Sequence, residues 1–85
     1  MVYFVYILYS EKTDRYYIGS TSDIDKRLLK HNLGGTASTR PGRPWKIVYT
    51  ETLDTKTDAL KREKDIKKKK SRKYIEWLIS SRTAD

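Results

Sequence analysis

An uninterrupted apolar stretch near the N-terminus, residues 2–9 (VYFVYILY), constrains the fold more than any other part of this chain. Every position is aliphatic or aromatic, without the alternation typical of a strand that has one face in water. β-Branched and aromatic residues favour extended backbone. The stretch therefore predicts a central strand covered on both faces, in a chain whose 85 residues are enough for one domain.

Apolar material is scarce in the rest of the chain. Only about a third of the residues are apolar or glycine, against roughly 45–50% in typical soluble domains. The core must therefore use aromatic residues, and we expect Trp45, Tyr74 and Trp77 to belong to it. The chain has no cysteine, which excludes disulfides, thiolate zinc sites and a thiol nucleophile. No run is long enough to span a membrane and no signal peptide is evident, so we expect a soluble, cytoplasmic protein without membrane association.

The remaining sequence pattern predicts the order strand, strand, helix, strand, helix, helix. A polar turn separates the first strand from a second at residues 16–21, and the two form a hairpin. A third strand is predicted over residues 45–53, after a loop rich in Gly, Ser, Thr and Pro at 34–44. The expected fold class is α+β, a small, three-stranded, mainly antiparallel sheet flanked by helices. We expect one domain over residues 1–82 and a short C-terminal tail at 83–85.

Hydroxyl residues mark the expected helix starts. Ser22, three residues before an aspartate, predicts a helix that runs to about residue 33 and ends at two glycines. Thr55 predicts a second helix to about residue 70 in the same way. Ser71 opens a short last helix with apolar residues at helical spacing.

The positive charge is concentrated in one segment. The chain has a formal net charge of +8, and residues 61–73 alone hold nine basic and two acidic side chains. Such a segment attracts polyanions with salt-sensitive affinity. It could equally form a solvated helix face that keeps a small protein soluble. The charge by itself leaves both interpretations open.

One acidic residue, Glu63, is placed unusually for a charged side chain. A helical projection puts it inside the apolar arc that Ala59, Leu60 and Ile66 define and that we expect to face the core. A carboxylate there needs a cation, a hydrogen-bond donor or a metal ion as its partner. The alternatives are an ion pair with Arg27 or a lysine, a position at the boundary of the apolar arc, or a single carboxylate ligand for Mg²⁺.

Four further side chains offer acid, base or phosphate chemistry. Tyr6 and Tyr17 lie on neighbouring strands of the predicted hairpin, and Arg27 and His31 border the buried stripe of the first helix. Each is explained individually by core packing or hydrogen bonding. Together with Glu63 they supply the roles that metal-assisted phosphodiester cleavage requires.

The order of these residues resembles the GIY-YIG nuclease superfamily. The motifs are VYI at residues 5–7, YIG at residues 17–19, then Arg27, His31 and the later helical Glu63. The chain is most similar to the compact single-domain bacterial members, which resemble the nuclease domain of branched-DNA resolving subunits. Val5 stands where the first triplet of the family has glycine, and no cysteine-rich zinc module is present.

The resemblance implies a metal-dependent DNA endonuclease of low intrinsic sequence specificity, active in DNA repair or recombination. Glu63 would bind Mg²⁺ or Mn²⁺, and Arg27 would stabilise the phosphoryl group. Tyr6 would act as general base with Tyr17 and His31 completing the proton network, and His31 is the rival base. The expected partners are duplex or branched DNA and a protein that supplies specificity.

Further residues are expected to contact nucleic acid, from the basic segment, the long loop and the second strand. They are Gly19, Ser20, Arg40, Arg43, Lys61, Lys64, Lys67 and Lys68. The opposing hypothesis is a non-catalytic or partner-dependent nucleic-acid-binding module on the same fold. An RNA-associated protein that uses the same charge is a weaker third, and no oligomeric state follows from the sequence.

Overall fold

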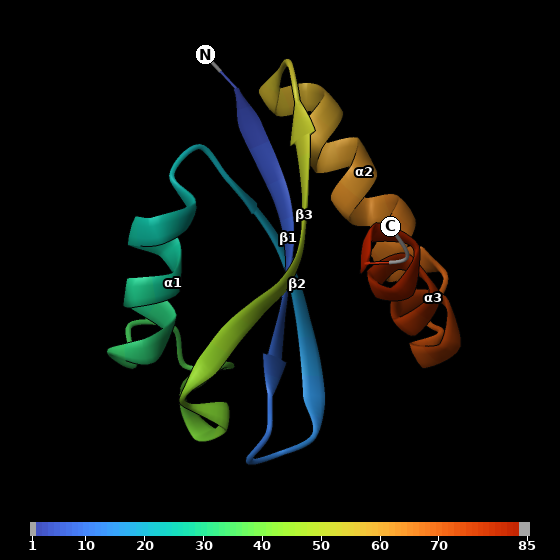
Figure 1. Ribbon diagram of the computed structural model, residues 1–85. Helices are drawn as coiled ribbons and strands as arrows, with labels where there is room; N and C mark the ends of the chain where they lie inside the picture. The colour runs from blue at the N-terminus through green and yellow to red at the C-terminus, as the bar shows by residue number, and fades with distance from the viewer. Residues whose placement is uncertain (1, 84–85) are drawn as a thin grey trace.

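The computed structural model describes residues 2–83, and it confirms the expected α+β fold and element order (Figure 1). Positions 84 and 85 of the expected tail lie outside the described residues. An antiparallel sheet of order β2-β1-β3 has helices on both faces. The elements are β1 (Tyr3–Ser10), β2 (Arg15–Thr21), α1 (Ile24–Asn32), the 3₁₀ turn η1 (Arg40–Gly42), β3 (Trp45–Leu53), α2 (Lys56–Lys68) and α3 (Arg72–Thr83).

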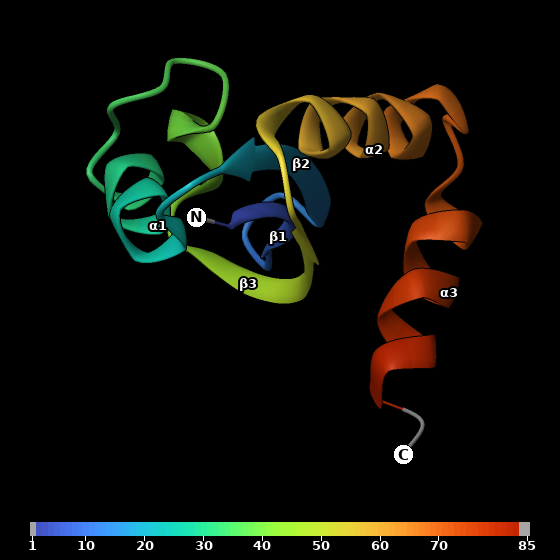
Figure 2. The same ribbon diagram turned by 90° about the horizontal axis from the view of Figure 1, so that it is seen from above.

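Strand β1 is central and buried on both faces, as its apolar sequence predicts. Val5 and Ile7 face α2 and α3, in a core cluster that includes Ile66 and Leu78. The alternate residues, Tyr6 among them, face α1 in a second cluster. Seen from above, α1 covers one face of the sheet while α2 and α3 cover the other (Figure 2). Strand β2 is thereby an edge strand between helices on opposite faces.

The helix starts follow the expected chemistry with one correction. Asp23, not Ser22, caps α1, because its carboxylate accepts from the Lys26 amide at 3.0 Å. Thr55 caps α2 and Ser71 Oγ accepts from the amide at position 74, as predicted. Helix α2 ends at Lys68 rather than near residue 70, since Lys70 adopts a left-handed φ of 47°.

The expectation that three late aromatic residues belong to the core is wrong for Trp77. Trp45 is 6% exposed and Tyr74 is half-buried, but Trp77 is 61% exposed. Helical phase explains the difference, because Leu78 and its neighbours at positions 75 and 79 form the stripe that meets the sheet. Position 77 lies on the opposite side of α3, so the scarcity of apolar residues does not force Trp77 inward.

The long loop before β3 is fastened to the sheet. The Trp45 indole donates to the Thr39 carbonyl at 2.7 Å, and the hydroxyl of buried Ser10 donates to the Gly42 carbonyl at 2.6 Å. Asn32 accepts from the Trp45 amide and donates to its carbonyl, which ties the end of α1 to the start of β3. These contacts fix the position of Thr39 relative to α1.

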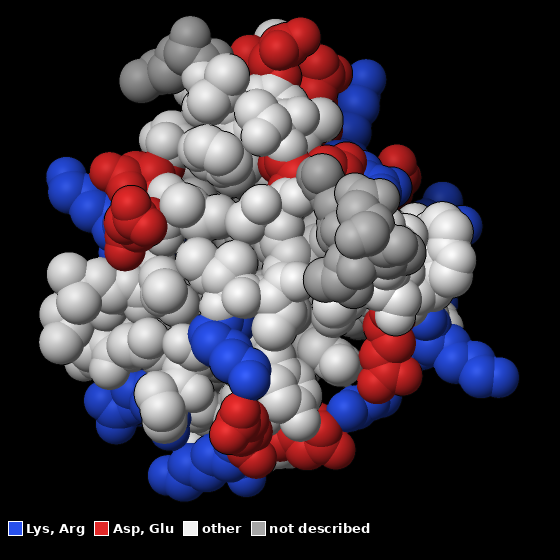
Figure 3. Space-filling view, viewed as in Figure 1, with Lys and Arg blue, Asp and Glu red and all other residues white. Residues whose placement is uncertain are grey.

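The face on the β3 side of the molecule carries scattered charges of both signs with uncharged surface between them (Figure 3). The basic segment is therefore not gathered over this face. Within the described part of the chain, no helix combines the length and the apolar composition needed to cross a bilayer.

The packing of α2 predicts contrasting effects at two apolar positions of the same helix. Ile66→Ala removes a side chain that is 1% exposed in the main core cluster and should lower the free energy of unfolding by about 2–5 kcal/mol. Leu60→Ala, at a position that is 46% exposed, should change it by about 0.5 kcal/mol or less. Urea denaturation measures both. Equal losses would contradict the assignment of the core face of α2.

Candidate active site

The edge strand β2 connects two groups of polar side chains. Tyr6 of β1 pairs with Gly19 of β2 in the sheet, so both lie on the α1 face. Ser20, the next residue, points to the opposite face, where α2 packs. A Cβ atom at Gly19 would overlap the Tyr6 hydroxyl and come within 2.6 Å of Tyr6 Cζ. Glycine is therefore required for Tyr6 to pack against this strand.

On the α1 face, Tyr6, His31 and Thr39 form a hydrogen-bond chain. Tyr6 Oη lies 3.1 Å from His31 Nε2, and His31 Nδ1 lies 2.8 Å from Thr39 Oγ1. The Thr39 hydroxyl donates to the Thr36 carbonyl at 3.2 Å, so Thr39 Oγ1 accepts from Nδ1–H. Nε2 of the neutral imidazole then carries no proton and accepts from the Tyr6 hydroxyl.

Burial determines whether the Tyr6 phenol and the His31 imidazole carry a proton at neutral pH. Tyr6 and His31 are each 1% exposed. Burial raises the pKa of Tyr6 to about 12, although the neighbouring Arg27 acts in the opposite direction. Burial also lowers the pKa of His31, and the positive charges of Arg27 and Lys30 lower it further. At neutral pH the phenol is protonated and the imidazole is neutral.

Tyr17 completes the aromatic part of the group. Its ring lies edge-on to His31 with centroids 4.9 Å apart, and 6.4 Å from the rings of Tyr6 and Trp45. It thus contributes to the packing that holds the imidazole in place.

On the other face, the Glu63 carboxylate has two partners. Ser20 Oγ donates to Glu63 Oε1 at 2.6 Å, and Lys67 Nζ lies 2.6 Å from Glu63 Oε2. The Glu63 side chain is 18% exposed. The ion pair with a lysine that the sequence left as one alternative is therefore formed, one helical turn along α2. Within the described residues no cluster of three or more His, Asp or Glu side chains could hold a metal ion.

A pocket of about 250 Å³ opens where β2 ends, between α1 and α2. Arg27 lines it from α1, Lys56 and Ala59 line it from α2, and Tyr3 of β1 and residues 20–22 at the end of β2 complete it. Among the side chains that the structure describes, no carboxylate pairs with Arg27. The guanidinium beside this pocket is suited to binding an anion.

The residues expected to contact nucleic acid divide into three groups. Gly19, Ser20 and Lys67 lie at the two faces described above. Arg40 and Arg43 brace the loop, because Arg40 Nε donates to the Gly34 carbonyl at 3.0 Å and Arg43 Nε donates to the Arg40 carbonyl at 2.9 Å. The other lysines, Lys61, Lys64 and Lys68, are exposed along α2.

The role of Thr39 was not predicted from the sequence. Thr39 lies in a loop of small and hydroxyl residues (TASTR, residues 36–40), where nothing local distinguishes it from its neighbours. Thr39 differs from these neighbours in that its carbonyl accepts the hydrogen bond of the Trp45 indole. A hydroxyl cluster eight residues after His31 was the available signal.

Comparison with known proteins identifies the family. A sequence profile described as the GIY-YIG catalytic domain matches residues 2–75. The chain belongs to the GIY-YIG family. This GIY-YIG chain is 46% identical over 66 residues to a UPF0213 protein of Staphylococcus saprophyticus, a match that covers 76% of this chain and 79% of that protein. A UPF0213 protein of Syntrophus aciditrophicus is 47% identical over 68 residues, 76% of each chain.

A solved structure also resembles this GIY-YIG domain. The solution NMR structure of the UPF0213 protein BH0048 from Bacillus halodurans is 36% identical, with a TM-score of 0.58, over 94% of this chain and 84% of that one. The resemblance to compact single-domain GIY-YIG proteins is therefore confirmed. The family is a nuclease family, and the five candidate residues all lie within the matched range.

The burial of the Tyr6–His31–Thr39 hydrogen-bond chain predicts the direction of the pKa shift of His31. His31 is the only histidine in the protein. We expect its pKa by NMR to lie below about 6.5, the value of a free side chain. The unfolded chain then takes up the proton first, so stability should fall as pH drops below about 6.5.

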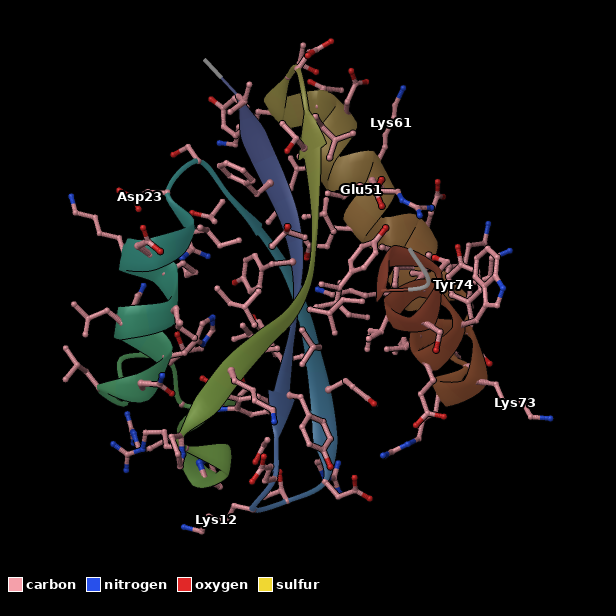
Figure 4. The ribbon with its side chains drawn as sticks, in the orientation of Figure 1. Lys12, Asp23, Glu51, Lys61, Lys73 and Tyr74 are labelled. Carbon is pink, nitrogen blue, oxygen red and sulfur yellow. The ribbon has the colours of Figure 1, made fainter. Side chains whose placement is uncertain are left out.

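Arg27→Met should raise the pKa of His31, because it removes a neighbouring positive charge. Lys12→Met, at the tip of the β1–β2 hairpin (Figure 4), is the control and should leave it unchanged. A His31 pKa above about 6.5 in the native protein would contradict the structure.

Proposed function

We propose that this protein is a divalent-metal-dependent DNA endonuclease of low intrinsic sequence specificity. The observation that carries the proposal is the arrangement around the end of β2: Arg27 beside a pocket with no carboxylate partner among the described side chains, the Tyr6–His31 pair on one side and Glu63 on the other. Phosphodiester hydrolysis requires an activated water, stabilised charge on the phosphoryl oxygens and a stabilised leaving oxygen. Each requirement has a candidate group here.

Arg27 is the proposed phosphoryl ligand. Its guanidinium has no carboxylate partner among the described side chains and lines the pocket with Lys56. A planar guanidinium donates two charge-assisted hydrogen bonds to phosphoryl oxygens, and these strengthen as charge builds in the transition state.

Glu63 is the proposed metal ligand. Mg²⁺ and Mn²⁺ prefer carboxylate oxygens, and Mg²⁺ retains several waters, so a single partly exposed carboxylate fits. Ser20 orients this carboxylate through Oε1, whereas Oε2 is paired with the Lys67 ammonium, the cation that a metal ion would replace. When bound, the ion supplies a Lewis acid for the phosphoryl and leaving oxygens.

Tyr6 and His31 are the proposed proton acceptors, acting as a pair. A phenol with a pKa of about 12 holds its proton at neutral pH and is a poor source of phenolate. The unprotonated Nε2 of His31 removes this difficulty, because Tyr6 can pass its own proton to the imidazole as it takes one from water. Thr39 keeps His31 in the required tautomer.

The same geometry also suits the second candidate function, a nucleic-acid-binding module without cleavage. The Glu63–Lys67 ion pair favours it, since this pairing satisfies the carboxylate with no metal. DNA is the proposed partner in both cases, with a protein partner that supplies specificity. We also propose a cytoplasmic role in DNA repair or recombination.

Nicking of supercoiled plasmid with Mg²⁺ distinguishes the two functions. Glu63→Gln and Arg27→Ala should each lower the rate by about 100-fold or more. The exposed residues Glu11 and Arg15 provide matched controls, Glu11→Gln and Arg15→Ala, which should retain the rate.

Mn²⁺ binding, followed by electron paramagnetic resonance without DNA, should be weakened in Glu63→Gln alone among these variants. Wild-type nicking no faster than that of Glu63→Gln would leave the binding module as the function.

The Tyr6–His31 relay predicts an acid limb in the pH–rate profile. The rate should fall as pH drops through the lowered pKa of His31, because the protonated ring cannot accept from Tyr6. The kinetic pKa should equal the one measured by NMR, and His31→Gln should remove the limb along with most of the rate. An unchanged limb in His31→Gln would assign it to another group.

A further inference from the structure

The two aromatic residues Tyr74 and Trp77 of α3 form a stacked pair. Their ring centroids lie 5.9 Å apart with an interplanar angle of 30°. Trp77 is 61% exposed, whereas Tyr74 is partly buried against the core. A large aromatic surface left in water, in a chain with little apolar material, is typical of a binding site.

A basic groove adjoins this pair. A hollow of about 680 Å³ between α2 and α3 is lined by Arg62, Asp65, Lys68, Lys69 and Tyr74. Lys69 Nζ lies 5.5 Å from the centre of the Tyr74 ring. Figure 4 places Tyr74 at the junction of the two helices and Lys73 on the outer side of α3. Positively charged side chains therefore lie directly beside the aromatic pair.

The charges of the groove favour an anionic partner. Arg62 is paired with Glu51 at 2.8 Å, and Asp65 adds one carboxylate. Among the described side chains, no carboxylate forms an ion pair with Lys68 or Lys69. The surrounding segment, residues 61–73, has nine basic and two acidic residues. The positive charge therefore exceeds what the local carboxylates neutralise.

We infer that Tyr74, Trp77 and the lysines beside them form a binding site for an unpaired nucleic-acid strand. Exposed aromatic rings stack on unpaired bases, while neighbouring cations bind the phosphates. In a duplex the base faces are covered by one another, so aromatic rings gain little from it. This site is separate from the pocket at the end of β2, and its occupation does not depend on cleavage.

Binding of a labelled dT₁₅ strand, followed by fluorescence anisotropy without metal, tests the inference. Trp77→Ala should weaken binding by about tenfold or more, the effect of losing one stacked base. Trp77→Phe should retain most of the affinity. Leu29→Ala, at a comparably exposed apolar position on α1, is the matched control and should bind like the native chain.

A hairpin duplex and an rU₁₅ strand complete the experiment. The duplex should bind Trp77→Ala and the native protein alike, and rU₁₅ reports whether the site prefers DNA. The affinity for dT₁₅ should depend less steeply on salt concentration in a Lys68→Ala, Lys69→Ala double variant. In Trp77→Ala this salt dependence should remain unchanged. Quenching of Trp77 fluorescence by dT₁₅ should be lost in Trp77→Phe.

Equal dT₁₅ affinities of Trp77→Ala and Leu29→Ala would overturn the inference. So would a Trp77-dependent dimer in sedimentation, since the aromatic pair would then be a contact between two copies of the chain. Because each readout is binding, failure here leaves the nicking experiment interpretable, and failure of nicking leaves this site standing.

Discussion

The candidate site depends on a sheet that is buried on both faces and open at one edge. The continuous apolar sequence of β1 requires helices on both sides, which places β2 at an edge between α1 and α2. Successive residues of a strand point to opposite faces. Gly19 therefore packs on Tyr6 under α1, and Ser20 hydrogen-bonds to Glu63 on α2. Side chains from α1 and α2, which cover opposite faces of the sheet, therefore lie against the same edge strand.

The two halves of the site are held by different forces. Tyr6 and His31 are almost fully buried, and their protonation states follow from desolvation and from the Thr39 hydrogen bond. The Glu63 carboxylate is partly exposed and is held by a hydroxyl and an ammonium. A buried hydrogen-bonded pair thus lies on one face of β2, and a partly exposed carboxylate paired with an ammonium lies on the other.

Much of the architecture can be predicted from local sequence, and the predictions that failed did so for physical reasons. The strand at residues 45–53 and the Thr55 cap are predicted because β-branched runs and hydroxyl caps act over a few residues. Ser22 and Asp23 are adjacent and equally good caps, so local energetics do not choose between them. The Trp77 prediction failed because composition ignores helical phase. Thr39 could not be told apart from the hydroxyl residues beside it, since the loop is fixed by the Trp45 indole and, from far away in the sequence, by Ser10 of β1.

The proposed function requires that Glu63 bind a divalent ion across β2 from the Tyr6–His31 pair. Paramagnetic broadening by substoichiometric Mn²⁺ tests it directly, because the effect falls steeply with distance from the ion. We expect the His31 imidazole and Tyr6 ring signals to broaden at lower Mn²⁺ concentrations than those of Trp77. In Glu63→Gln we expect this difference to disappear. Sharp His31 and Tyr6 signals at Mn²⁺ concentrations that broaden resonances elsewhere would contradict it.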